Sequence, residues 1–124
     1  MPLSDATAPL YAIKAELFKS LAHPVRIQVL EVLSAAAGHA APVSELLEAT
    51  GAEASALSQH LTVLKRAGVV RSDRHGNAVV YQLSEPLVAD LLVVARAFLT
   101  SRLEHSSAQL AAASSLPTLQ GSTR

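Results

Sequence analysis

The 124-residue chain contains no cysteine and no tryptophan, and only two tyrosines and two phenylalanines. Without thiols it has no disulfide bonds, no cysteine-ligated metal site and no cysteine nucleophile. Hydrophobic residues make up 50% of the chain and charged residues only 16%, so a core can form, and it must consist of aliphatic side chains. The length and composition predict one folded domain rather than a disordered chain.

Long apolar runs and a secretory start are also absent. An apolar run such as residues 91–95 is far shorter than the roughly 20 residues that a membrane-spanning helix needs. Residues 1–5 lack the basic and then apolar order of a secretory signal. We therefore expect a soluble, cytoplasmic protein with no membrane partner.

The net charge is zero, which by itself does not favour nucleic acid as a partner. The charges are unevenly distributed, however. Residues 43–54 carry three glutamates and no basic residue, whereas residues 55–82 carry four basic residues and a single acid, Asp73. The four basic residues are Lys65, Arg66, Arg71 and Arg74. Positive charge is thus concentrated in one segment, beside an acidic one.

Apolar residues at helical spacing, with proline and glycine at the ends, predict four helices before Gly68. They cover residues 9–20, 24–35, 43–49 and 53–67, with a loop at residues 38–42. The second helix is apolar on most of its sides, so we expect it at the centre of the fold. A tight turn at residues 50–52 separates the third helix from the fourth.

After Gly68 the apolar spacing changes to every second residue, which is typical of strands. Residues 69–74 and 78–83 are the predicted strands, and Gly76 and Asn77 between them are a signal for a hairpin turn. The fold class is therefore mainly α with a small β-hairpin, in the order α-α-α-α-β-β-α.

A long final helix is predicted from Pro86 to about Ala111. The expected domain organisation is a flexible N-terminus at residues 1–8, a folded domain at residues 9–111 and a disordered tail at residues 112–124.

The predicted fourth helix separates two kinds of side chain around its axis. Leu57, Leu61 and Leu64 fall within one narrow arc and must face the core. The polar residues of the opposite arc and its flank are Ser55, Ser58, Gln59, Thr62, Lys65 and Arg66. Gln and Arg can read adenine and guanine in the major groove of DNA, and Ser or Thr can bond to bases or phosphates. From this helix alone, an ordinary solvated face is an equally good interpretation.

The neighbouring segments favour DNA binding. A short helix and a tight turn precede the fourth helix and a basic hairpin follows it, which is the order of a winged helix-turn-helix. Arg74, His75 and Asn77 lie at the predicted hairpin tip, where a wing meets phosphates or a minor groove. Solvated turn residues are the alternative there. His60, at the edge of the core arc, is expected to be a structural residue packed against the hairpin.

Three segments resemble the ArsR/SmtB family of bacterial repressors: residues 21–30, 57–70 and 74–81. The most specific motif is Ser-x-His-Leu-x-x-Leu-x-x-x-Gly-Val-Val, which begins at Ser58. The resemblance covers residues 10–103 and implies a homodimer that binds double-stranded operator DNA and releases it when an effector binds. Glu53 departs from the family, which usually has Ser, Thr or Asp at this helix start. Glutamate is a poorer cap there, and phosphate mildly repels it.

The resemblance also implies two places where a metal effector could bind, one in the third helix and one in the last helix. This chain departs from the family's pattern at both. The third helix, which often carries cysteines in metal-sensing members, has none. In the last helix Asp90 could begin the second pattern, but Leu92 and Leu103 stand in place of its histidines. No cofactor is therefore expected. His105 and Glu104 are a weaker candidate pair for zinc or nickel shared between two copies, and an exposed helix-end histidine is the plainer interpretation.

The final helix carries two apolar stripes, although packing on one small domain needs only one. The stripes are Leu87, Leu91, Val94 and Phe98, and Val88, Leu92, Ala95, Leu99 and Leu103. In a monomer one stripe would stay exposed, together with apolar residues of the first helix. We therefore predict a homodimer through the first and last helices. Its predicted interface is Leu10, Ile13, Leu17, Leu92, Leu99 and Leu103. Burial of both stripes within one chain is the alternative.

These observations predict a sequence-specific transcriptional regulator, a repressor that occupies a pseudo-palindromic promoter site as a dimer. The alternative is a winged-helix protein-interaction module that no longer binds DNA, which the zero net charge and Glu53 would favour. An enzyme is not expected. Ser58, His60 and Asp73 are the residue types of a hydrolytic triad, but no nucleophile elbow or oxyanion loop accompanies them.

Overall fold

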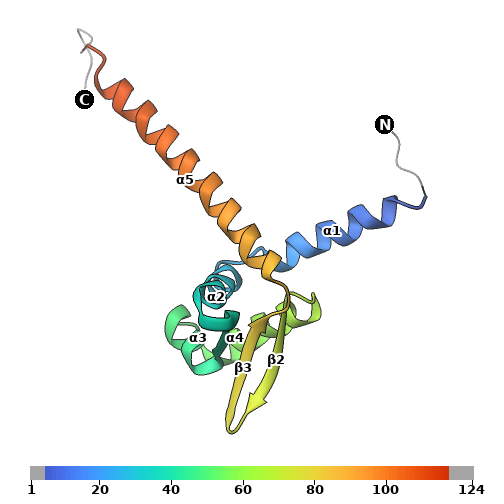
Figure 1. The fold of residues 1–124 in the computed structure, drawn as a ribbon. Coiled ribbons are helices and arrows are strands. Elements are labelled where there is room, and N and C mark those ends of the chain that lie inside the picture. The colour runs from blue at the N-terminus through green and yellow to red at the C-terminus, as the bar shows by residue number, and fades with distance from the viewer. Residues whose placement is uncertain (1–4, 118–124) are drawn as a thin grey trace. The chain divides into compact units, whose positions relative to one another are not determined.

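The computed structural model describes residues 5–117 (Figure 1). Its elements are α1 (Ala8–Leu21), α2 (Pro24–Ala35), a 3₁₀ turn (Ala37–His39), β1 (Ala40–Pro42), α3 (Val43–Thr50), α4 (Ala54–Arg66), β2 (Val70–His75), β3 (Ala78–Leu83) and α5 (Pro86–Ser114). The chain divides into two units, Met1–Leu92 and Val93–Arg124, and the division falls inside α5. The sheet and the first four helices all belong to the first unit.

Proline and glycine set the helix ends, so the four helices predicted before Gly68 are confirmed to within one residue at each end. Pro24 lies in the first turn of α2, where a missing N–H costs nothing. The Nδ1 atom of His23 caps this helix by accepting a hydrogen bond from the Val25 amide at 3.1 Å. Gly51 ends α3 in the left-handed conformation, with a φ of 65°. The resulting tight turn leads directly into α4.

The predicted hairpin is present, but the prediction of a loop at residues 38–42 was wrong. Residues Ala40–Pro42 form a third strand, β1, which pairs antiparallel with β3 and places Ala41 opposite Tyr81. The sheet therefore has three strands in the order β1-β3-β2. Alanine and proline have low strand propensity and three residues show no alternation, so only the tertiary pairing with β3 makes this segment a strand.

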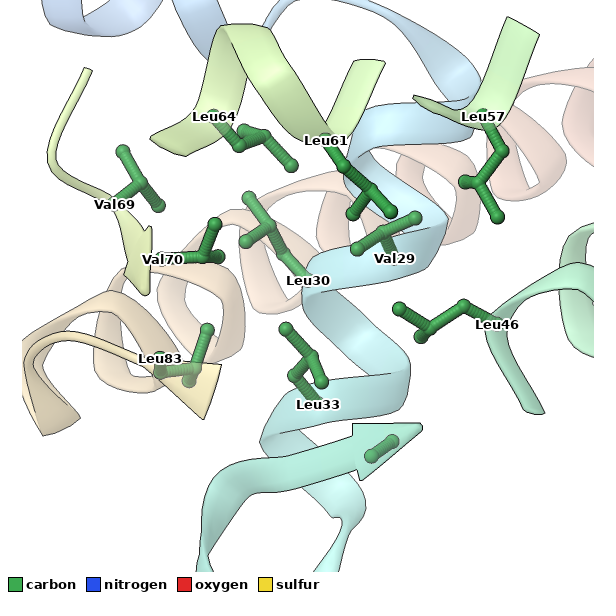
Figure 2. Packing of buried hydrophobic residues seen from close by; sticks show 11 residues of the cluster. Val29, Leu30, Leu33, Leu46, Leu57, Leu61, Leu64, Val69, Val70 and Leu83 are labelled. Atoms are coloured by element: carbon green, nitrogen blue, oxygen red, sulfur yellow. The ribbon is translucent and has the colours of Figure 1, made fainter. Parts of the chain in front are cut away.

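A purely aliphatic cluster forms the core of the first unit (Figure 2). Its central helix is α2, as predicted, which contributes Val29, Leu30 and Leu33. Around them lie Ala41, Leu46, Leu57, Leu61, Leu64, Val69, Val70 and Leu83. The three leucines that were expected to anchor α4 are each at most 2% exposed. Because α4 is held by one face only, its opposite face is left to solvent.

The ends of the chain differ in part from the predicted organisation. Helix α1 already includes Ala8, and α5 continues to Ser114, so residues 112–114 are helical rather than part of a disordered tail. Three consecutive alanines, which are strong helix formers, precede this end. The remaining flexible-end predictions for residues 1–4 and 118–124 lie outside the described residues. Among the helices of residues 5–117, none combines the length and the apolar character needed to cross a membrane.

Candidate nucleic-acid interface

Helix α4 presents a continuous polar face to solvent. All of its predicted contact residues are exposed: Ser55, Ser58, Gln59, Thr62, Lys65 and Arg66. The helix follows α3 after a turn of three residues, as the second helix of a helix-turn-helix does. In that motif the second helix enters the major groove while the first crosses the backbone. The side chains that would meet DNA are therefore gathered on one face, and we call this set the reading face.

Two hydroxyl groups of the reading face already make local hydrogen bonds. The Thr62 hydroxyl donates to the backbone carbonyl oxygen of Ser58 at 2.9 Å. The Ser55 hydroxyl donates to the Glu53 carboxylate at 2.5 Å. Glu53 stands at the N-cap of α4, where its side chain makes no capping hydrogen bond. The sequence identified Glu53 as a poor cap but did not predict that Ser55 would hold its carboxylate.

The hairpin β2–β3 forms the wing, with Arg74, His75 and Asn77 exposed at its tip. The Asp73 carboxylate lies 3.5 Å from the Nε2 atom of His75. It also accepts a hydrogen bond from the Arg74 amide at 2.9 Å. These contacts orient the tip, and the Arg74 guanidinium stays in solvent, where it could approach a phosphate.

Side-chain hydrogen bonds connect the wing to the rest of the site. The Lys65 ammonium donates to the Ser72 hydroxyl at 2.7 Å and so joins α4 to β2. The Arg71 Nε and Nη2 atoms both donate to the Gln82 Oε1 atom, at 3.1 and 3.0 Å. Gln82 in turn donates to the Gly38 carbonyl oxygen at 3.0 Å. Arg71 is a basic residue of this surface that was not among the predicted site residues, because it lies near the start of β2 and not at the hairpin tip.

His60 packs beside a second imidazole that the sequence did not indicate. Its ring lies on the ring of His23, with the centroids 4.1 Å apart and the planes tilted by 40°. Burial lowers the pKa of His60, and the nearby positive charges of His23 and Arg26 lower it further. The Arg26 Nε atom is buried with no hydrogen-bond partner among the described residues. His60 therefore belongs to the α2–α4 packing and not to the reading face.

The residue types of a hydrolytic triad are not brought together. The ring of His60 lies on the ring of His23, and the Asp73 carboxylate lies beside His75 on the wing. A Ser-His-Asp triad needs the carboxylate on the same histidine that activates the serine, and these contacts pair Asp73 with a different histidine.

Apolar side chains are exposed on α1 of the first unit and, separately, on the part of α5 that belongs to the second unit. No residue of α1 is buried, and Leu10, Ile13 and Leu17 are 59%, 65% and 38% exposed. On α5, Leu99 and Leu103 are 55% and 62% exposed. Each of the two units therefore exposes apolar side chains, as expected of residues that would be buried in a dimer.

Leu92 is the exception among the six predicted interface residues. It is partly buried, and together with Val88 it packs against the core of the first unit. The start of its stripe thus covers the protein's own core, whereas Leu87 of the other stripe is exposed. Both stripes are apolar throughout, so the sequence alone did not show which of them begins on the core.

The weak metal candidates His105 and Glu104 are both exposed on α5. Within residues 5–117 the structure holds no group of three or more His, Asp or Glu side chains that could bind a metal ion. A site at His105 would therefore need ligands from another copy of the chain.

Known proteins share both the sequence and the fold. A helix-turn-helix domain family model matches residues 21–73. The HTH-type transcriptional regulator Rv0081 of Mycobacterium tuberculosis is 50% identical over 103 residues, which are 82% of this chain and 88% of that protein. Its crystal structure matches with a TM-score of 0.72 at 49% identity, over 80% of this chain and 97% of that one.

Two more distant proteins extend the comparison. The solution structure of Mb0332 from Mycobacterium bovis is a homodimeric winged helix-turn-helix DNA-binding domain of a possible ArsR-family regulator. It matches with a TM-score of 0.73 at 30% identity, over 83% of this chain and 93% of that one. The HTH-type transcriptional repressor SmtB of M. tuberculosis is 38% identical over 78 residues, which are 63% of this chain and 56% of that protein.

A helix-turn-helix whose second helix exposes a polar face, followed by a basic β-hairpin, defines a winged helix-turn-helix DNA-binding regulator. The chain belongs to the ArsR/SmtB family of these regulators. The alternative of an interaction module without DNA binding is not favoured, because the matched proteins are transcriptional regulators.

Proposed function

We propose that this protein is a transcriptional repressor that acts as a homodimer on a pseudo-palindromic promoter site. The observation that carries the proposal is the reading face of α4, whose exposed side chains are all neutral hydrogen-bonding groups or cations. An ordinary solvated helix face usually alternates acids and bases. This one instead has the residue types that contact base edges and phosphates.

The residues of the site divide into two roles. Gln59 and Arg66 have the amide and guanidinium groups that pair with adenine and guanine in the major groove. Ser58 and Lys65 complete the contacts along α4, where hydroxyl and ammonium groups suit phosphates as well as bases. Ser55, whose hydroxyl hydrogen is donated to Glu53, would meet a base as a hydrogen-bond acceptor. On the wing, Arg74, His75 and Asn77 would approach the adjacent backbone or minor groove.

Dimer formation makes the site specific for a palindrome. Pairing through the exposed apolar residues of α1 and α5 would bury these side chains and set two reading helices about 34–36 Å apart, one turn of DNA. Each copy then reads one half-site. Because the proposed partner is double-stranded operator DNA, we place the protein in the cytoplasm.

Salt-titrated binding of the full-length protein to promoter fragments tests the proposal. We expect one fragment to be bound more tightly than shuffled DNA of equal length, with a dimer on each site. The Gln59→Ala variant should lose about 1–3 kcal/mol of this preference, because the amide that reads a base edge is removed. Equal affinity of the wild-type protein for all fragments, or no binding at low salt, would overturn the proposal.

A further inference from the structure

Thr62 occupies the middle of the reading face, one helical turn from both Gln59 and Arg66. Its side chain is exposed, yet its hydroxyl hydrogen is already used. The Oγ1 atom donates to the Ser58 carbonyl oxygen at 2.9 Å, one turn earlier in α4. Thr62 is the reading-face residue whose hydroxyl is bonded to the backbone of α4 itself.

This hydrogen bond decides what Thr62 can present to DNA. In a helix, threonine has two favoured rotamers, and the one that bonds to the carbonyl four residues earlier fixes the position of the methyl group. With its only hydrogen engaged, the hydroxyl cannot donate to an acceptor such as guanine O6 or thymine O4. The Oγ1 lone pairs can still accept from adenine N6 or cytosine N4, but toward guanine or thymine the methyl group is the part of the side chain that remains to make a contact.

In the major groove, one base presents an apolar group that matches the methyl group of Thr62. Thymine presents its C5-methyl there, and the methyl group of threonine is one of the apolar groups that contact it. Cytosine, adenine and guanine present polar edges without a methyl group, and these would lose hydration against an apolar neighbour. Contact between the two methyl groups therefore selects thymine.

We propose that Thr62 is a specificity-determining residue that recognises a thymine in each operator half-site through its methyl group, while its hydroxyl stays bonded to the backbone of α4. This inference rests on the proposed function, which it deepens by naming a base and the chemical group that reads it. The hydroxyl then has a positioning role.

Matched changes in the protein and the DNA test the proposal. The operator is first obtained by selection from random DNA with the wild-type protein, and each thymine in it is then replaced by deoxyuridine, which lacks only the methyl group. For the wild type, one thymine per half-site should be sensitive, at about 4-fold in affinity for one half-site and about 15-fold for both. Thr62→Val keeps the methyl group and should keep this sensitivity. Thr62→Ser keeps the hydroxyl, and should bind thymine and deoxyuridine operators alike.

Three results would overturn the inference. They are a wild-type protein that tolerates deoxyuridine everywhere, a Thr62→Ser variant that still distinguishes the two bases, and a Thr62→Val variant that no longer does. Thr100→Ser on α5, an exposed threonine outside the reading face, is the control and should leave the sensitivity unchanged. If the wild type selects no sequence at all, the proposed function itself fails. That result is distinct from a selected operator that is insensitive to deoxyuridine.

Discussion

Arg74 at the tip of the wing should raise the affinity for DNA through its charge, without a preference for any sequence. Its guanidinium is exposed, and its backbone amide donates a hydrogen bond to the Asp73 carboxylate. We expect Arg74→Ala to weaken binding to specific and shuffled DNA equally and to reduce the slope of log affinity against log salt by about one. Filter binding or fluorescence anisotropy across a salt series measures this. Arg102→Ala removes the same charge from α5 and should not change the slope; a loss confined to the operator would contradict the prediction.

His60 should make stability depend on pH. Burial and the charges of His23 and Arg26 lower the pKa of His60, so the folded protein binds fewer protons than the unfolded chain, in which the value is close to 6.5. The free energy of unfolding should therefore be highest above that value and fall as pH decreases through it. Urea denaturation at a series of pH values between about 8 and 5 measures the effect.

Replacement of the imidazole isolates this contribution. His60→Gln keeps a polar side chain of similar size that does not titrate, so its unfolding free energy should fall less steeply below the ordinary histidine pKa. An identical pH dependence in the variant and the wild type would show that other groups cause the loss.

Among the elements, α5 packs on the core of the first unit at its start and carries residues of the proposed dimer interface further along. Substitutions can separate these two roles. Leu99 is exposed, so Leu99→Glu should leave the core of the first unit intact but place an unpaired charge in the proposed interface. We expect a monomer or an aggregate by light scattering, with operator binding lost although no DNA contact has been changed. Leu92→Glu should also lower the free energy of unfolding, because Leu92 packs on the core.

A charge beside the interface provides the control. Thr100→Glu adds the same carboxylate one residue further along α5, outside both apolar stripes, and should remain dimeric. A dimer in the Leu99→Glu variant would move the interface elsewhere.

Local signals were enough to predict most elements. Pro24 and Gly51 mark their helix ends by backbone geometry, and Leu57, Leu61 and Leu64 show the buried side of α4 by their spacing. The strand Ala40–Pro42 was missed because its pairing with β3 is the only thing that makes it a strand. Such pairing depends on a segment far away in the sequence.

In the candidate site, too, features set within one element could be predicted, whereas contacts between elements could not. The exposed residues of α4 could be predicted, since a helix with a leucine stripe must expose its opposite face. The contact between His60 and His23, and the hydrogen bonds of Arg71 to Gln82, join residues from different elements. No spacing rule within one segment reveals contacts of this kind.

For the whole molecule, the response of the operator complex to metal tests a site shared between two copies at His105. If zinc or nickel binds between two copies through His105, metal should release the operator from the wild-type protein and not from His105→Ala. The affinity for metal should weaken in acid, because a protonated imidazole cannot act as a ligand. Titration of each metal against a preformed operator complex, followed by anisotropy, measures the release.

Two outcomes would contradict this site. Tight metal binding and release that survive in His105→Ala would place the ligands elsewhere, for example at His23. The absence of any metal response in the wild type would favour an organic effector, a partner protein, or control by abundance of the regulator.

The wing is attached to the helix-turn-helix on both of its sides. Strand β1, which leads directly into α3, pairs with β3, and Lys65 of α4 bonds to Ser72 of β2. Each copy therefore approaches DNA with its reading parts already assembled, and little conformational entropy is lost on docking. We expect an effector to change the distance between the two α4 helices of the dimer and to leave the fold of each copy unchanged. The two reading faces would then no longer match the helical repeat of the operator.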